Sequence, residues 1–171
     1  MRLFTLAFVL LLSAASAQAQ RYKPSKGSPE DLLDRYYQMI NDGELLTPEG
    51  WKKAIRLFEQ PSKYPVNGTI YVTTAYPLGN GPMEVNGDHA VAYQKWVDDL
   101  GSINASLQYK PPPPENAKVE GVIRICHLKR IAGEWRIEGS LTTRACSRKA
   151  AIRYLEYRRA KSIDPETQAK H

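Results

Sequence analysis

The stretch VEGVIRICHLKRIAGEWRIEGSLTTRA, residues 119–145, carries the strongest β-strand signal in the chain and therefore decides the fold class. Two runs rich in β-branched and aromatic residues, 119–131 and 135–145, flank the short turn Ala132-Gly133-Glu134. A three-residue loop with a central glycine predicts a β-hairpin. Pairing Ile131 with Trp135 gathers most of the apolar residues on one face, so we expect this register.

In that register His127 lies opposite Gly139, where the missing side chain leaves space beside Ile125. His127 is therefore the first candidate for a ligand-binding or catalytic residue, because imidazole titrates near neutral pH. A core histidine bonded to a backbone carbonyl is the alternative. Arg124 falls on the opposite face of the hairpin, which we expect to be exposed.

Two short amphipathic helices are expected before the sheet. Ser28 is a natural N-cap, Pro29 suits a first helical turn, and apolar residues then recur at three- and four-residue spacing up to Gly43. Thr47 and Pro48 open the second helix, whose apolar stripe extends to Phe58. Helices followed by strands indicate an α+β fold.

The remaining segments complete this organisation. Extended runs are expected at 69–76, 83–85, 89–97 and 103–109, and the prolines 111–114 predict a stiff exposed loop. A last helix is expected over 147–161, with Ser147 as its cap, and residues 162–171 form a polar tail.

These features resemble the nuclear transport factor 2-like superfamily, which includes the SnoaL-like and ketosteroid-isomerase-like proteins with a cystatin-like α+β cone. The resemblance rests on the element order, on SPED at 28–31, on LTPEGW at 46–51 and on GEWRI at 133–137, and it covers residues 28–143. It implies helices packed against a curved, mostly antiparallel sheet that forms a cone with a pocket. Some members of the superfamily use that pocket for catalysis and others only for binding or assembly. No catalytic motif is recognisable, so no catalytic residue is carried over, and the basic last helix departs from the family pattern.

The N-terminus reads as a secretory signal peptide over residues 1–19. Arg2 precedes a ten-residue apolar run, and small residues then offer cleavage near Ala17 or Ala19. The run is too short for a helix of about 20 residues that spans a bilayer. We therefore expect a secreted or periplasmic protein that is not integral to a membrane, with a flexible leader at 20–27 and one domain at 28–161.

The positive charge is concentrated in one segment. Residues 144–161 hold seven cations against Glu156, a surplus of six that equals the net charge of +6 for the whole chain. Such a cluster attracts anionic polymers or lipid headgroups, whereas the alternative is a solvated helix whose basic stems cover apolar neighbours. The anion-binding candidates are Arg148, Lys149, Arg153, Arg158 and Arg159.

Aromatic and acidic residues supply the other site candidates. Tyr71, Tyr93 and Trp96 lie on expected strands and would line a hydrophobic pocket. Asp98 and Asp99 offer a carboxylate base at a bend in the sheet.

Neither the cysteines nor the other metal-binding residue types form a clear site. Two cysteines in an exported protein are a possible disulfide pair. The expected hairpin, however, separates Cys126 from Cys146 by about 20 Å, too far for a disulfide unless the chain folds back after Arg144. No metal-ligand spacing and no glycine-rich phosphate loop is present, so no metal or cofactor is expected.

Three functions are consistent with these observations. We favour an exported, non-catalytic module that binds a small apolar or amphipathic molecule or that self-associates as a homodimer. The second is an isomerase, cyclase or dehydratase that uses His127 and a carboxylate. The third is an electrostatic binder of anionic polymer or membrane through residues 144–161, without specific nucleic-acid recognition.

Overall fold

The protein has an α+β fold built from helices and two mixed sheets. The computed structural model describes residues 24–75, 83–97, 100–111 and 122–163. The helices are α2 (Pro29–Asp42), α3 (Pro48–Ala54) and α4 (Arg148–Ile163), with single 3-10 turns at η2 (Glu44–Leu46) and η3 (Ile55–Leu57). The strands are β1 (Phe58–Gln60), β2 (Ile70–Val72), β3 (Thr74–Ala75), β4 (Met83–Asn86), β5 (His89–Val97), β6 (Ser102–Ile103), β7 (Tyr109–Lys110), β8 (Val122–Ile131), β9 (Glu134–Ser140) and β10 (Arg144–Cys146).

Both predicted N-terminal helices begin at the predicted caps. Ser28 Oγ accepts a hydrogen bond from the Asp31 amide at 3.2 Å, and Thr47 Oγ1 accepts one from the Gly50 amide at 3.1 Å. Gly43 ends α2 in the left-handed conformation, with φ at 79°. The second helix is shorter than predicted, because Phe58 belongs to β1 and pairs in parallel with Ile137 of β9.

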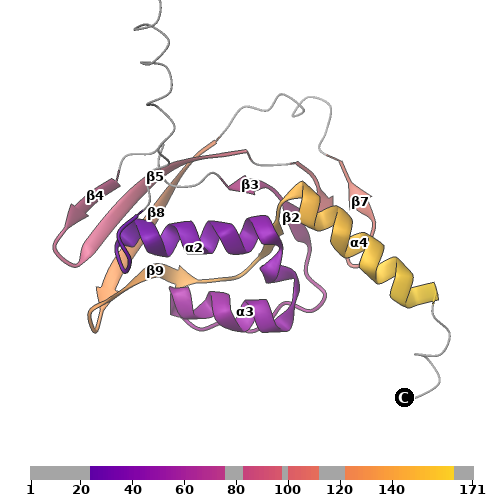
Figure 1. The fold of residues 1–171 in the computed structure, drawn as a ribbon, viewed down its shortest axis with the longest axis horizontal. Helices are drawn as coiled ribbons and strands as arrows, with labels where there is room; N and C mark the ends of the chain where they lie inside the picture. Colours follow the sequence, from indigo (N-terminus) through magenta and orange to yellow (C-terminus); the bar gives the residue numbers. More distant parts are fainter. Residues whose placement is uncertain (1–23, 76–82, 98–99, 112–121, 164–171) are drawn as a thin grey trace, which may run out of the picture.

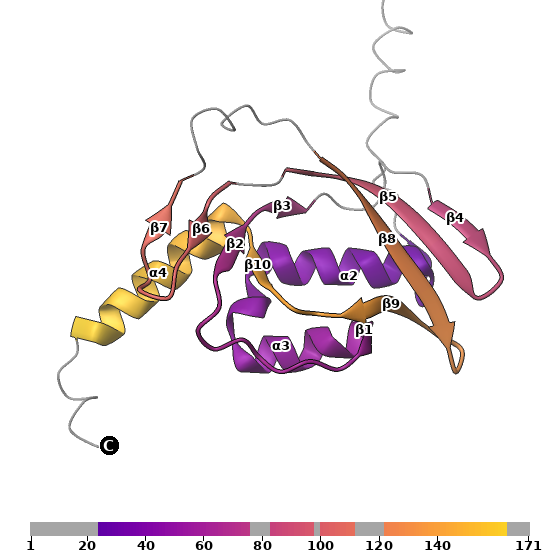
Figure 2. The ribbon, with the colours of Figure 1, turned by 180° about the vertical axis from the view of Figure 1, so that it is seen from behind.

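The larger sheet covers one side of α2 (Figures 1 and 2). Its strand order is β1-β9-β8-β5-β3, with β4 also paired to β5, and only the β1–β9 pair is parallel among its described strands. Leu33 and Ile40 of α2 are fully buried against Ala92 and Leu128 of the sheet. Small alanines on β5 let the helix approach the sheet closely, which places the main core between these two layers.

The register predicted for the last hairpin was wrong by one residue. The structure pairs Ile131 with Glu134 and Leu128 with Ile137. The turn contains only Ala132 and Gly133, both with positive φ, at 50° and 84°, which is the backbone pattern of a two-residue hairpin. Because side chains alternate along a strand, this slip reverses the two faces of β8.

Burial along β8 shows the result of this reversal. Leu128 is fully buried and Cys126 is partly buried on the side of α2. Ile123 and Ile125 are 69% and 57% exposed on the outer face, and His127 is exposed there as well. The β8 half of the face that we expected to line the core therefore faces away from α2, whereas Trp135 and Ile137 of β9 are buried in the core as expected.

A second sheet forms where the chain leaves the first one. Its order is β10-β2-β6-β7, with β10 and β2 in parallel. The predicted strand at 135–145 breaks between β9 and β10, so Arg144 pairs with Ile70 instead of continuing the hairpin. The predicted single strand at 103–109 is instead a β6–β7 hairpin, whose turn holds Leu107 at a φ of 59°.

The last helix begins at its predicted cap and points away from the rest of the fold (Figure 1). Ser147 Oγ accepts a hydrogen bond from the Ala150 amide at 3.3 Å, while the Ser147 hydroxyl donates to the carbonyl of Asn41 at 2.6 Å. Leu155 is buried against the body, whereas each residue of 156–161 is exposed. Within the described part of the chain, no helix has the length and apolar character needed to cross a membrane.

Several predictions concern residues outside the described ranges. These are the signal peptide at 1–19, the first half of the leader at 20–23, Asp98 and Asp99, the prolines 112–114 and the tail from 164 to 171. They stay predictions.

Candidate functional site

A hollow of about 520 Å³ lies between α2, β2 and the ends of β5 and β8. Its volume falls within the range of roughly 300–1,000 Å³ that is usual for small-molecule sites. Aromatic, aliphatic and hydroxyl groups form most of its wall, and Arg124 is its charged residue. The lining residues are Tyr36, Ile40, Tyr71, Val72, Thr73, Trp96, Gly101, Arg124, Thr143 and Ala145.

Trp96 is the best-anchored aromatic residue of the hollow. It is 8% exposed, and the ring of Tyr37 packs edge-on against it with centroids 5.1 Å apart. Its indole Nε1–H donates to Gln94 Oε1 at 3.3 Å. These contacts hold the indole in one orientation at the wall of the hollow.

Arg124 brings a positive charge to the same wall. Its guanidinium carbon lies 5.2 Å from the centroid of the Trp96 ring, within cation–π range. Arg124 is exposed, so the charge sits at the open side of the hollow. An anionic group that enters the hollow would therefore contact the planar guanidinium of Arg124, which is already positioned against the Trp96 ring.

Gln94 lies directly opposite Arg124 on the neighbouring strand and is 6% exposed. An indole N–H only donates, so the bond from Trp96 identifies the Gln94 oxygen and fixes the orientation of the amide. Gln94 Nε2 has no hydrogen-bond partner among the described residues. A buried amide nitrogen beside Trp96 and Arg124 therefore offers unused donor capacity close to the hollow.

The tyrosines near the hollow are neutral. Burial raises the pKa of Tyr36 and of Tyr37 well above the ordinary value, nearby Cys126 adds to this rise, and Arg124 opposes it. Each phenol therefore keeps its proton through the physiological pH range. Tyr36, which lines the hollow, presents a neutral hydroxyl rather than an anion.

No protein-family profile, curated protein or solved structure matches the chain. The resemblance to the nuclear transport factor 2-like superfamily therefore stays an expectation. The α+β class is shown by the structure itself.

The structure brings two of the four predicted ligand-binding residues to the hollow. Tyr71 and Trp96 both line it. His127 and Tyr93 belong to the outer face of the sheet, where Val91 pairs with His127 and Tyr93 pairs with Ile125. His127 is thus separated from the hollow by the sheet itself.

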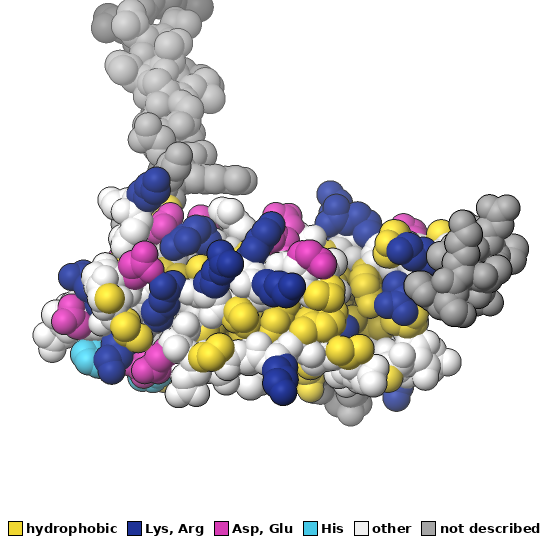
Figure 3. All heavy atoms as spheres, turned by 90° about the horizontal axis from the view of Figure 1, so that it is seen from below, with side chains coloured by type: hydrophobic (Ala, Val, Ile, Leu, Met, Phe, Trp, Pro, Cys, Tyr) yellow, Lys and Arg dark blue, Asp and Glu magenta, His cyan; other side chains and the backbone are white. Residues whose placement is uncertain are grey.

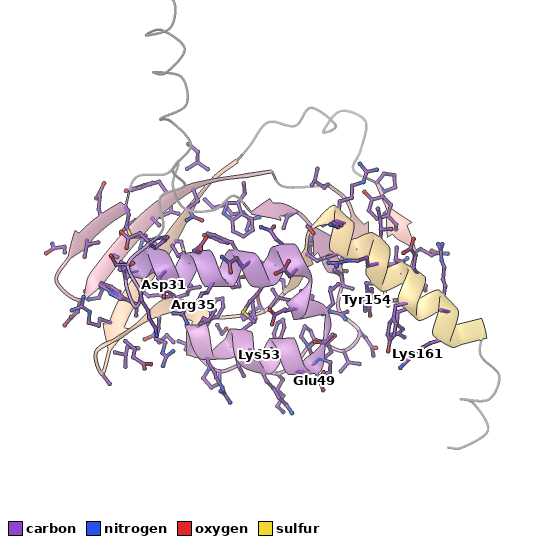
Figure 4. All side chains as sticks on the ribbon, viewed as in Figure 1. Asp31, Arg35, Glu49, Lys53, Tyr154 and Lys161 are labelled. Atoms are coloured by element: carbon purple, nitrogen blue, oxygen red, sulfur yellow. The ribbon has the colours of Figure 1, made fainter. Side chains whose placement is uncertain are left out.

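The five predicted anion-binding residues all lie on α4. Arg148, Lys149, Arg153, Arg158 and Arg159 are exposed. Arg158 stacks near the ring of Tyr154, with its guanidinium carbon 5.9 Å from the centroid, and Lys161 lies 5.0 Å from the centroid of Tyr157. Figure 4 labels Tyr154 and Lys161 on this projecting helix.

Sequence reasoning missed Tyr36, Gln94 and Arg124. The wrong register placed Arg124 on the outer face, although the pattern of β5 held a usable signal. Ala90, Ala92, Gln94 and Trp96 alternate along β5, and the two alanines mark the face on which a helix packs closely. If that face had been taken as the inner one, Gln94 and Trp96 would have been predicted to lie beside the core. Arg124, which pairs with Gln94, would then have been predicted there as well.

No group of three or more His, Cys, Asp or Glu side chains within the described ranges is arranged to hold a metal ion. His89 Nδ1 lies 3.6 Å from a carboxylate oxygen of Glu138, and both side chains are well exposed. This contact is an isolated surface pair, so we assign it no chemistry.

Both cysteines are free thiols in the structure. Burial raises the pKa of Cys126 to about 11, with a further rise from Glu138. Burial likewise raises the pKa of Cys146 to about 12, although Arg144 opposes the rise. Both groups are therefore protonated and unreactive near neutral pH.

These thiols predict a loss of stability in alkali. A thiol of the unfolded chain ionises near its ordinary pKa of 9.0, whereas the folded chain keeps the proton to higher pH. The contribution to stability is complete below pH 9 and declines as the pH rises toward 11 and 12. We expect the free energy of unfolding, measured in urea, to fall between pH 9 and pH 10. The double variant Cys126→Ala with Cys146→Ala should show a shallower fall over the same interval, and an equal fall would contradict this assignment.

Proposed function

We propose that this protein binds a small amphipathic molecule with an acidic group in the hollow between α2 and strands β2, β5 and β8. The observation that carries the proposal is the pairing of Trp96 with Arg124 at the wall of a 520 Å³ hollow. The anchored indole suits an apolar or aromatic body. The guanidinium suits a carboxylate, sulfonate or phosphate.

Gln94 and the neutral phenols support an acidic ligand rather than a basic one. The unused Gln94 Nε2 is a donor, and the protonated Tyr36 hydroxyl is able to donate as well. Arg124 would repel a ligand cation. Arg124 and Tyr36 line the hollow and favour an oxygen acceptor there, and Gln94 Nε2 adds a buried donor next to Trp96.

The lining favours binding without proton transfer. The described residues that line the hollow include no imidazole, thiol or carboxylate. The isomerase reading needs His127 and a carboxylate in one cavity, whereas His127 is exposed on the outer face of the sheet. The proposal therefore assigns the hollow a binding role and gives His127 no part in it.

Two fluorescent probes with the same aromatic body test the proposal. The first is 8-anilino-1-naphthalenesulfonate, and the second is N-phenyl-1-naphthylamine, which lacks the sulfonate. We expect the folded protein to bind the sulfonate probe more tightly. Arg124→Met should weaken binding of the sulfonate probe by about tenfold, the loss expected for one charge-assisted hydrogen bond in a partly exposed site. The same substitution should leave the affinity for the uncharged probe nearly unchanged.

Arg130→Met is the matched control for this titration. Arg130 lies on the same strand and also stacks over a tryptophan, with its guanidinium carbon 4.7 Å from the Trp135 ring, yet it does not line the hollow. This variant should bind both probes like the wild type. Equal weakening of the sulfonate probe by both substitutions, or no weakening by Arg124→Met, would contradict the proposal.

Self-association through the outer face of the sheet is the second candidate, because Ile123 and Ile125 expose large apolar side chains there. Sedimentation velocity on the titration samples separates the two candidates. If the protein dimerises and the dimer dissociation constant is the same with and without the probes, the exposed sheet face acts independently of the hollow.

A further inference from the structure

A second concave surface lies between α4 and strand β7, apart from the hollow described above. It has a volume of about 260 Å³. Ala151 and Leu155 are buried at its floor, Ile152 is 50% exposed, and Tyr109 contributes an exposed ring from β7. We call this surface the α4–β7 groove.

Two arginines flank the apolar floor of the α4–β7 groove. Arg148 and Arg159 both line it and are both exposed. Eleven residues separate them, which corresponds to about three turns, so they lie on the same side of α4 and roughly 16 Å apart along its axis. Glu156 also lines the groove, between these two cations.

The other wall of the groove is the end of a sheet. Strand β7 is the last in the order β10-β2-β6-β7, so among the described strands only β6 pairs with it. The Tyr109 hydroxyl donates to the carbonyl of Leu100, which fixes the ring that faces α4. The edge of a sheet is a surface to which an extended peptide can bind by pairing with the last strand.

The distribution of charge on α4 argues against a flat membrane as the partner. The other basic residues of α4 lie on different sides of the helix from Arg148 and Arg159; they include Lys149, Arg153 and Lys161. The helix therefore has no continuous apolar face that is distinct from its basic residues. A helix that lies in a membrane interface needs such a face. A purely anionic polymer would use the charges but not the apolar floor. In Figure 3 the end of the molecule that carries α4 shows hydrophobic side chains beside Lys and Arg side chains.

We propose that the α4–β7 groove binds an extended acidic peptide segment of a partner protein. The segment carries two carboxylates for Arg148 and Arg159 and an apolar side chain between them for the floor at Ile152 and Leu155. At about 3.3 Å per residue, a span of roughly 16 Å places the carboxylates five residues apart. Glu156 lies eight residues from Arg148 and three from Arg159, so it repels a carboxylate between the two arginines, which selects against acidic residues grouped in the middle of the segment.

Labelled hexapeptides test this spacing directly. The probe is fluorescein-labelled Glu-Ala-Leu-Ala-Ala-Glu, and the comparison peptide Ala-Ala-Glu-Glu-Ala-Ala has the same charge with its acids at the centre. We expect fluorescence anisotropy at low ionic strength to show that the full chain binds the first peptide at least threefold more tightly. The double variant Arg148→Gln with Arg159→Gln should weaken that binding by about tenfold or more.

The double variant Lys149→Gln with Arg153→Gln is the charge-matched control. It removes two cations from the same helix, but neither residue lines the groove. This control should weaken binding of the first peptide by less than threefold. Far-ultraviolet circular dichroism should show that all variants are folded. Equal loss in both double variants, equal affinity for the two peptides, or binding to phosphatidylglycerol vesicles but to neither peptide would overturn the proposal.

Discussion

Gly50→Ala should destabilise the protein by more than about 3 kcal/mol, because the first turn of α3 leaves no room for a methyl group. A Cβ atom at position 50 would lie 2.0 Å from the carbonyl oxygen of Glu44 and 2.6 Å from its carbonyl carbon. Both atoms belong to the backbone of η2, so no side-chain rotation relieves the clash.

The clash is severe because the Glu44 carbonyl accepts two of the hydrogen bonds that connect η2 to α3. Glu44 O accepts hydrogen bonds from the Thr47 amide at 3.1 Å and from the Thr47 hydroxyl at 3.2 Å. The same Thr47 oxygen accepts from the Gly50 amide. Moving Glu44 away from a new methyl group would break this set of bonds and would displace the cap of α3.

Thermal unfolding followed by circular dichroism measures this effect. A loss of about 3 kcal/mol corresponds to a fall in Tm of roughly 10 °C for a domain of this size. Glu49→Ala is the control, since Glu49 precedes Gly50 in the same helix and is exposed (Figure 4). It should cost less than about 1 kcal/mol through its interaction with the helix dipole. A Gly50→Ala protein as stable as the control would show that η2 and α3 are not in this contact.

Arg144→Met should cost about 3 kcal/mol, because it removes a buried cation that ties two segments together. Arg144 is buried on β10. Its Nη1 donates to the Tyr64 hydroxyl at 3.1 Å and its Nη2 donates to the carbonyl of Gly68. The guanidinium carbon also lies 5.4 Å from the centroid of the Tyr64 ring.

Two opposing effects decide the size of this loss. Removing a buried charge relieves its desolvation, which favours the variant. Methionine keeps most of the apolar stem but leaves the Gly68 carbonyl without the guanidinium donor, and two charge-assisted bonds of about 1.5–3 kcal/mol each disappear. We expect the lost bonds to dominate.

Urea unfolding of Arg144→Met, with Arg35→Met as the control, measures the balance. Arg35 forms a partly exposed pair with Asp31 at 3.2 Å, which is expected to contribute less than about 1 kcal/mol. Similar stability of both variants would show that the loop before β2 does not depend on Arg144.

Local chemistry predicted the helices better than the sheets. Ser28, Thr47 and Ser147 are caps whose side chains bond the first turn, and that information lies within four residues of sequence. Phe58 continued the helical spacing, yet it pairs with Ile137 about 80 residues away, so a long-range contact overrides the local pattern.

The hairpin shows how one turn changes the site. Ala132 with positive φ is unusual for a residue with a side chain, and the sequence therefore favoured a longer loop over the two-residue turn. The slip moved His127 to the outer face and Arg124 to the face of the hollow. Trp96 and Tyr71, both proposed from the sequence as ligand-binding residues, line the hollow, and their placement does not depend on that turn.

The most direct test of ligand binding in the hollow uses the indole N–H resonances of the three tryptophans. Trp96 lines the hollow, whereas the Trp51 indole donates to Ser62 and Trp135 packs beneath Arg130. In ¹⁵N-correlated spectra, added 8-anilino-1-naphthalenesulfonate should shift the Trp96 indole signal and leave the signals of Trp51 and Trp135 in place. A bound probe that shifts either of those signals but not that of Trp96 would contradict the account.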